Sequence, residues 1–320
     1  MPGGIGSARW PPGNDGNTQS RAGKKHEQMA SESGGARVSV PAATIEGPPP
    51  DLVFRRLVRP WAMLRELWGA RELVVALTER DLRARYKQTK LGFAWSILTP
   101  ILLMVVFTLF FQRAANVDTN GVPYPLFTYV ALLPWTFFND SVAKGAQSIT
   151  SNLSLVNKVY CPREVFPLSA VATAAFDTII ATCVLGLLFA GFTFMPAGGI
   201  VWLPVLLAVQ VAFTVGAGLF LSAIVVYFRD LRQVTPMALQ LALFATPVAF
   251  GLNVIPADWR PIYAVLNPIG PVIDSYRQTI LYGEAPPGGL LALAAVSATV
   301  WLVGGYLVFK RLETGFADVA

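Results

Sequence analysis

The sequence predicts an all-α membrane protein, and three observations lead to this prediction. Of its 320 residues, 54% are hydrophobic and 14% are charged, whereas a soluble domain averages about 25% charged residues. The mean hydropathy is +0.51. Residues 93–111 form a run without charge, close to the ~20 residues that a helix needs to cross about 30 Å of hydrocarbon. These features exclude an ordinary soluble enzyme.

Five further apolar stretches follow, so we expect six transmembrane helices in all. Their approximate bounds are 93–111, 124–142, 166–194, 201–228, 235–252 and 288–309. Pro134 lies inside the second stretch and Pro247 inside the fifth, and a proline inside a membrane helix kinks it.

The distribution of basic residues predicts the orientation. Of 25 Lys and Arg residues, only Arg113, Arg260 and Arg277 fall in segments that this topology places outside. Basic residues flanking a span stay on the cytoplasmic side. Both the N-terminus and the C-terminus are therefore expected to be cytoplasmic.

Three regions are expected along the chain. Residues 1–50, rich in Gly, Pro, Ser and Ala, suggest a disordered cytoplasmic tail, either a solvated extension or a partner-binding segment. Residues 51–92 contain two helical stretches, 60–68 and 71–86, which either lie along the cytoplasmic membrane surface or form a packed cytoplasmic pair. In the second stretch, Leu73, Leu77 and Ala84 share a face. Residues 93–320 carry the six spans.

The segment 253–287 is too apolar for a free outer loop. Apolar residues are interrupted at Asn267-Pro268 and at Gly270-Pro271, which fits two short helices with a break between them. Neither is long enough to span, so we expect a re-entrant pair that dips into the outer leaflet. A surface hairpin of two amphipathic helices is the alternative.

Few residues qualify as carriers of chemistry. Asp177 lies alone within the third span, and an intramembrane carboxylate is a functional candidate. Its side chain either makes a structural hydrogen bond or lines the channel. Phe107, Phe110 and Phe111 share one face of the first span, and more aromatics crowd the second. They form either an interfacial belt or a series of rings along which sugars slide. The sequence contains no nucleotide-binding GxxxxGK[ST] loop, and one His with two Cys is too few for a zinc site.

The order of several short motifs resembles the membrane subunits of type 2 ABC exporters of polysaccharide and polyol phosphate, which include O-antigen, teichoic acid and lipid-linked galactan exporters. The matching residues are 71–73, 81–88, Leu91, Gly92, Trp95, Leu98, Pro100, 132–135, Phe137, Phe138, 158–160, 162–164, 228–231 and 306–318. Cys161 departs from the aromatic or apolar residue expected there. The joint order of the motifs, from residue 71 to the C-terminus, is specific.

The resemblance implies a homodimeric permease in the bacterial cytoplasmic membrane that works with two copies of a separate ABC nucleotide-binding subunit. The expected cargo is a lipid-linked polysaccharide, with no nucleic acid partner. ATP and Mg²⁺ would bind the partner subunit, and no cofactor would bind this chain. The helix at 71–87 would be a gate helix at the membrane surface, and the pair in 253–287 would be outer gate helices.

Four groups of residues are expected to carry the function of such a permease. Residues that couple the chain to the ATPase are Asn157, Lys158, Tyr160, Pro162, Arg163 and Glu164, where Pro162 blocks a helix and the charged side chains are offered to a soluble partner. A lipid diphosphate would enter beside Arg80, Arg83, Arg85 and Lys87. The polysaccharide channel would involve Trp95, Phe107, Phe110, Phe111, Phe127, Trp135 and Phe138. The outer gate would involve Trp259, Tyr263 and Tyr276.

Two other classes of function compete with an exporter. A membrane-bound transferase acting on lipid-linked sugars would need an acid/base pair or a metal site at the interface, and His and carboxylates are sparse. An ion-coupled secondary transporter would show inverted repeats with paired broken helices, and the sequence has no convincing internal repeat. Co-purification with a Walker-containing partner would favour the exporter.

Overall fold

The computed structural model describes residues 68–88, 94–112, 119–158, 161–196 and 198–316. All the described residues belong to one compact unit. The expected tail at 1–50 and most of the helix expected at 60–68 lie outside the described residues. Within the described ranges the regular structure is helical, without a β-strand, which confirms the all-α class.

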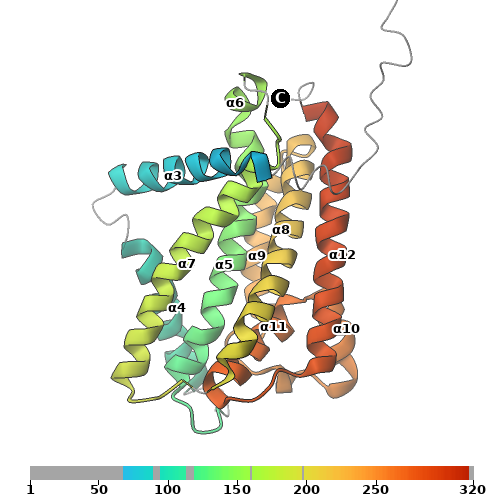
Figure 1. Cartoon of the computed structure of the whole chain (residues 1–320). Coiled ribbons are helices and arrows are strands. Elements are labelled where there is room, and N and C mark those ends of the chain that lie inside the picture. Colours follow the sequence, from blue (N-terminus) through green and yellow to red (C-terminus); the bar gives the residue numbers. More distant parts are fainter. Residues whose placement is uncertain (1–67, 89–93, 113–118, 159–160, 197, 317–320) are drawn as a thin grey trace, which may run out of the picture. The chain divides into compact units, whose positions relative to one another are not determined.

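Long helices form a bundle, and short ones cover its two ends (Figure 1). The long helices are α4 (Ala94–Phe107), α5 (Tyr124–Ser151), α7 (Val165–Gly191), α8 (Leu203–Tyr227), α9 (Leu231–Ala245) and α12 (Gly288–Leu312). A π-helical turn, Thr108–Gln112, continues α4, and a 3₁₀ turn, Gly199–Trp202, leads into α8. The helix α3 (Arg71–Gln88) lies across one end of the bundle, near the short α6 (Leu153–Lys158).

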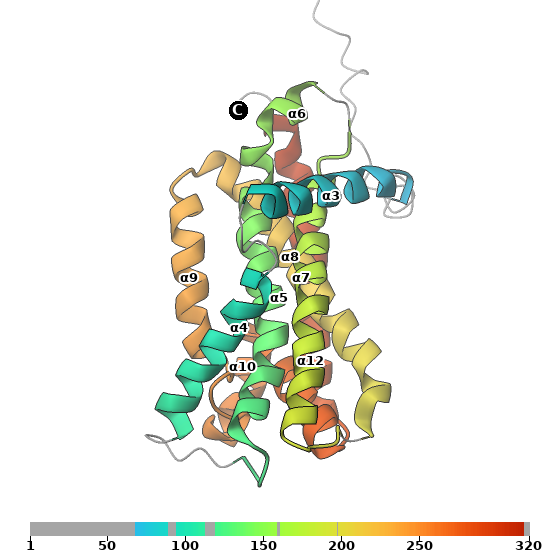
Figure 2. The same cartoon turned by 90° about the vertical axis from the view of Figure 1, so that its left-hand side faces the viewer.

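Helix α5 is the centre of the bundle because it packs against α4, α7, α8, α9 and α11 (Ile269–Arg277). Figure 2 shows α9 and α7 on opposite sides of it. Most of the side chains on its first five turns are buried. Helix α8 also packs extensively against α12.

Within the described ranges, four helices are long and apolar enough to cross a membrane by length and composition: Ala94–Phe111, Val165–Gly191, Gly199–Tyr227 and Gly288–Gly315. They correspond to the expected first, third, fourth and sixth spans. The expected second and fifth spans coincide with α5 and α9, which do not meet this criterion. Helix α5 is surrounded by other helices, so it needs less apolar surface than a lipid-facing helix. Helix α9 has only 15 residues.

Two helix ends differ from the expected spans. Helix α5 continues to Ser151, nine residues beyond the apolar stretch, because the polar residues that follow contain no proline and can stay helical. Helix α9 ends at Ala245 instead of continuing to 252. Pro247 explains this end, since a proline disfavours the helical conformation of the residue before it, and Thr246 is extended.

The outer segment contains the two short helices that its sequence predicts. Helix α10 (Arg260–Leu266) is followed by a break at Asn267 and Pro268 and then by α11, which a π-helical turn, Gln278–Tyr282, extends. Helix α10 packs against α12, and α11 packs against α5, α8 and α12. Figure 1 places both at the end of the bundle opposite α3. Their depth in a membrane stays a prediction.

Candidate functional site: a polar cluster below the crosswise helix

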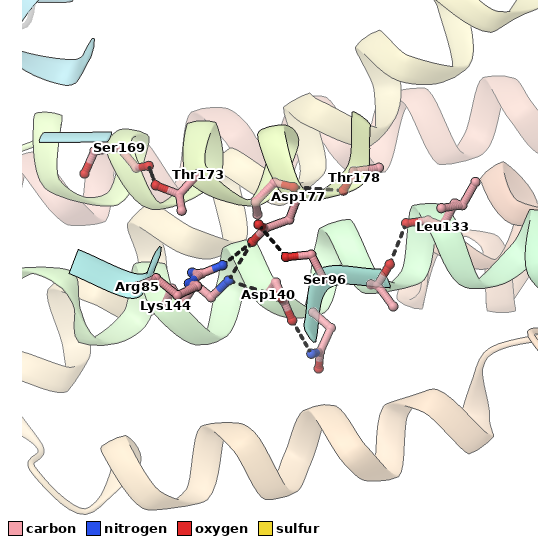
Figure 3. Close-up of polar contacts among 12 residues, drawn as sticks. Arg85, Ser96, Leu133, Asp140, Lys144, Ser169, Thr173, Asp177 and Thr178 are labelled. Atoms are coloured by element: carbon pink, nitrogen blue, oxygen red, sulfur yellow. Dashed lines mark hydrogen bonds and ion pairs between the residues drawn. The ribbon is translucent and has the colours of Figure 1, made fainter. Parts of the chain in front are cut away.

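A carboxylate on α7 joins four helices near the end of the bundle that α3 covers. Asp177 is only 8% exposed. Its carboxylate accepts hydrogen bonds from the Arg85 guanidinium of α3, from Ser96 Oγ of α4 at 2.9 Å, and from Lys144 Nζ of α5 at 3.5 Å (Figure 3). Lys144 also forms an ion pair with Asp140, one turn earlier on α5, at 2.9 Å.

Two cavities adjoin this cluster. One, of about 330 Å³, lies between α3, α4, α5 and α7, and its wall includes Arg85, Trp95, Asp140, Lys144 and Asp177. The other, of about 460 Å³, lies between α3, α5 and α7 and shares Arg85 and Lys144. Positive groups on α3 and α5 therefore face hollow space at this end of the bundle.

The sequence predicts Asp177 as a functional candidate that lies alone within the third span, and the structure brings side chains from three other helices to it. Its partners lie 92, 81 and 33 residues away along the chain. Lys144 lies just beyond the second expected span, which ends at residue 142, and the additional turns of α5 hold it beside Asp177. Arg85 lies eight residues after the buried Leu77, so both side chains point from α3 toward the bundle. This spacing is the feature of the sequence that indicates an inward position for Arg85. Ala84 is exposed instead, because it borders the 460 Å³ cavity.

Three of the four residues expected to attract a lipid diphosphate form ion pairs within the chain. Arg80 pairs with Asp81 at 2.8 Å and donates to Asn152 Oδ1 at 2.9 Å. Arg83 pairs with Glu79 on the exposed side of α3. Arg85 is bound to Asp177, and the side chain of Lys87 lies outside the described residues. Arg80 and Arg85 therefore face the cavities, while Arg83 faces away from the bundle.

The segment expected to couple to an ATPase is attached to the end of α12. Arg163 donates a hydrogen bond to the carbonyl of Glu313, and its guanidinium lies 5.6 Å from the centre of the Phe316 ring. Glu164 is only 2% exposed and pairs with Lys310, which also binds Glu313 at 2.8 Å. The sequence predicted that Glu164 offers its charge to a soluble partner; the carboxylate instead faces α12.

The remaining coupling residues are only partly described. Asn157 and Lys158 end α6, but their side chains lie outside the described residues, as does all of Tyr160. Pro162 is half-buried. Burial raises the pKa of the Glu164 carboxyl, although the hydrogen bond from Lys310 opposes this. The second oxygen of Glu164 is buried with no hydrogen-bond partner among the described residues.

The aromatic residues expected to line a channel occupy two environments. Trp95 and Phe110 of the first span are exposed, at 51% and 66%, and Phe111 is half-buried. Those buried inside the bundle of this single chain are Phe107, Phe127, Trp135 and Phe138. Of these seven aromatic residues, only the three that are not buried, Trp95, Phe110 and Phe111, can therefore contact cargo without rearrangement of the bundle.

The residues expected at an outer gate also differ in burial. Trp259 is 64% exposed, whereas Tyr276 is buried. Tyr263 donates to the carbonyl of Ala245 at 3.0 Å, and Asn267 Nδ2 donates to the Tyr263 hydroxyl at 3.0 Å. The bond to Ala245 ties α10 to the end of α9.

Arg277 belongs to the segment 253–287 that the predicted topology places outside, and its side chain is buried at 1% exposure. The guanidinium donates to the carbonyls of Phe127, Pro247, Val248 and Phe250 and lies 3.7 Å from the centre of the Phe127 ring. It thereby binds the non-helical segment after α9 to the start of α5. A basic residue in an apolar segment indicates a buried structural or functional role. In the sequence, Arg277 serves only in the count of basic residues that predicts the orientation.

An all-helical bundle with several apolar helices, a helix across one end and a short broken pair at the other defines a polytopic membrane protein with two differently built ends. The chain belongs to the ABC-2 type transporter family, whose model matches residues 72–281. It is 36% identical to the O-antigen export system permease protein RfbA of Myxococcus xanthus over 80% of this chain and 98% of that protein.

More distant relatives have related names. The chain is 26% identical to the O-antigen export system permease protein RfbA of Klebsiella pneumoniae, over 78% of this chain and 95% of that protein. It is 24% identical to the polysialic acid transport protein KpsM of Escherichia coli, over 75% of this chain and 93% of that protein. Family membership and the apolar helices make this chain a multi-pass protein of the bacterial inner membrane, as the resemblance had implied.

Proposed function

We propose that this chain is the permease subunit of an ATP-driven exporter that moves a lipid-linked polysaccharide out of the cytoplasm. Two copies would form the conduit, and an ABC ATPase subunit would bind each copy at the end that carries α3 and α6. The observation that carries this proposal is the family match across residues 72–281, together with relatives named for O-antigen export and polysialic acid transport. ATP and Mg²⁺ would be bound by the partner, and this chain would hold no cofactor.

The polar cluster supports a path for the lipid carrier. Arg80 and Arg85 border open cavities beside α3, and cations near the cytoplasmic surface attract phosphate groups. Asp177 is bonded to α3, α4 and α5 at once, so a shift of α3 would alter the contacts of α4. The diphosphate would therefore arrive beside the helix whose exposed aromatic face is open to the polymer.

The attachment of Arg163 and Glu164 to α12 supports a route for coupling. A partner that moves the segment from Asn157 to Glu164 would pull directly on the start of α7 and on the end of α12, because Glu164 precedes α7 and pairs with Lys310. The segment would then transmit the movement of the ATPase to the transmembrane helices and shift the populations of their closed and conducting arrangements.

Reconstituted transport tests the function. The chain is purified with the ATPase that accompanies it, and both are placed in vesicles with the lipid-linked polymer that accumulates when cells are depleted of this chain. We expect ATP-dependent transfer of the polymer across the vesicle membrane only when both proteins are present. Arg163→Ala should reduce transfer about tenfold, because Arg163 joins the coupling segment to the C-terminal end through a charge-assisted bond.

The control is Arg311→Ala, an exposed arginine beside the same C-terminal end, which should transfer normally. Full transfer by the Arg163 variant, with normal ATPase binding, would contradict the coupling route. Modification of a lipid-linked sugar by the purified chain alone, with no ATPase and no transfer, would favour the alternative of a membrane-bound transferase.

A further inference from the structure

A second cavity system lies at the opposite end of the bundle, away from the polar cluster. It has a volume of about 530 Å³, within the range of small-ligand sites. The start of α5, the segment after α9, the end of α11 and the loop before α12 surround it. Its polar lining residues are Asn120, Asn253, Arg260, Asp274, Arg277, Gln278, Tyr282 and Glu284.

Hydrogen bonds within the chain hold several of these polar groups in place. Asp274 accepts from Gln278 Nε2 at 2.8 Å and from the backbone N–H of Leu252 at 3.5 Å. The Tyr282 hydroxyl donates to the carbonyl of Thr119 at 2.9 Å. Arg260 Nε donates to the carbonyl of Ile255 at 2.9 Å. A ligand would therefore meet a wall whose polar groups are already oriented, which lowers the entropy cost of binding.

The chemistry of the wall distinguishes among classes of ligand. Arg260 and Arg277 are balanced by Asp274 and Glu284, so the cavity has no excess charge that would select an anion or a cation. Donors and acceptors are mixed along the wall. A hydroxyl group both donates and accepts hydrogen bonds, whereas a phosphate needs donors and an ammonium needs acceptors. The wall therefore fits a molecule with many hydroxyl groups.

Two side chains at the rim have polar atoms to offer such a molecule. Asn253 and Glu284 are both exposed, and neither side chain has a hydrogen-bond partner among the described residues. Tyr282 adds a half-buried aromatic ring, and Pro287 and Leu290 add apolar surface. Apolar and aromatic lining with a few placed polar groups is the usual composition of a small-molecule site.

We infer that this cavity binds a sugar residue of the exported polymer on the side where the polymer leaves the membrane. The inference rests on the proposed function, because the cavity lies at the end opposite α3, where a polymer that started beside α3 would emerge. Glu284 and Asn253 bind hydroxyl groups at the rim, and Gln278 and Arg260 bind deeper ones.

Binding of simple sugars to the purified chain tests the inference without the ATPase. Saturation-transfer NMR is measured on the chain in lipid nanodiscs with methyl glycosides of several neutral hexoses at millimolar concentration, and with glycerol 3-phosphate as the anionic probe. We expect saturation transfer to at least one methyl glycoside. Glu284→Gln and Asn253→Ala should each weaken its binding about fivefold, the effect of one lost hydrogen bond.

The matched control is Asp258→Asn, an exposed carboxylate in the same outer segment that does not line the cavity; it should bind as the native chain does. Transfer to glycerol 3-phosphate alone, or equal binding by the native chain and both rim variants, would overturn the inference. Its failure is distinguishable from failure of the proposed function, because that function fails when ATP-driven transfer is absent from vesicles, whether or not glycosides bind.

Discussion

At the scale of single residues, Arg277 supplies hydrogen bonds to backbone carbonyls that have no helical partners at and after Pro247. The helix α9 stops before this proline, and the carbonyls that follow lack helical partners. One guanidinium offers five N–H donors in a rigid fork, and four of its hydrogen bonds reach the carbonyls of Phe127, Pro247, Val248 and Phe250. A single buried side chain thus binds three carbonyls of the segment that follows α9, and its fourth bond, to Phe127, ties that segment to α5.

Replacing Arg277 should therefore be costly. Arg277→Lys keeps the charge but has one nitrogen, so it cannot reach all four carbonyls; we expect a loss of about 3 kcal/mol in the free energy of unfolding, as for a broken buried polar network. Thermal unfolding of the purified chain in detergent measures this loss. Arg311→Lys, an exchange at an exposed position, is the control, and equal stability of the two variants would show that the carbonyls find other partners.

Single residues also mark the limit of what the sequence could predict. Asp177 stood out because a carboxylate in an apolar run is unusual, and its isolation in the run is visible without a structure. Its partners could not be predicted, because Arg85 and Ser96 come from other helices and their approach depends on how the bundle packs. Glu164 was assigned to a surface because charged residues usually lie there; its burial depends on Lys310, which is 146 residues away in the sequence.

At the scale of helices, α8 and α12 approach so closely that two glycines meet. A Cβ atom added at Gly216 would lie 2.5 Å from the backbone N of Leu302 and 2.5 Å from the backbone C of Trp301. A Cβ atom added at Gly305 would collide with the carbonyl of Gly216. Small residues permit this kind of close packing between membrane helices, where apolar burial provides little driving force.

A methyl group should separate these helices. For Gly216→Ala we expect a loss of about 2 kcal/mol in the free energy of unfolding, because the obstructing atoms are backbone and cannot rotate away. Gly304→Ala is the matched control: no atom lies within 4 Å of its added Cβ, and alanine favours a helix over glycine. The free energy of unfolding is measured for both variants in detergent. Equal values would mean that α8 and α12 can move apart without a loss of stability.

Helix positions were predicted better than helix ends for a physical reason. Hydropathy reports where a chain can lie in hydrocarbon, whereas helix ends depend on backbone bonds and prolines. The apolar stretches located α7, α8 and α12 closely, but they missed the polar turns of α5 that bring Lys144 to Asp177. They also extended the fifth stretch past Pro247, where the backbone leaves the helix.

At the scale of the whole bundle, burial explains why a six-span topology is compatible with four sufficiently long and apolar helices in the part of the chain that the structure describes. Helix α5 is enclosed by its neighbours, so its polar groups face protein and not lipid. Helix α9, at ~1.5 Å per residue, is about 22 Å long, and the non-helical residues after it are bound by Arg277. Broken backbone at membrane depth is tolerated where protein satisfies its polar groups. We therefore retain six spans as the prediction.

Cysteine accessibility decides between six spans and four. In a background with Cys161 and Cys183 replaced by serine, single cysteines are placed at four exposed positions. Gln233, in the first turn of α9, and Asp258, beyond its end, form one pair; Asn120 and Ser154, on either side of α5, form the other. Six spans predict that a membrane-impermeant maleimide labels Asp258→Cys and Asn120→Cys in intact cells, and the other two only after permeabilisation. If both members of a pair are labelled from the same side, the helix between them does not cross the membrane. Opposite labelling of both pairs, by contrast, requires α5 and α9 to span, and it places the cavity beside α11 on the outer side, where an emerging polymer would meet it.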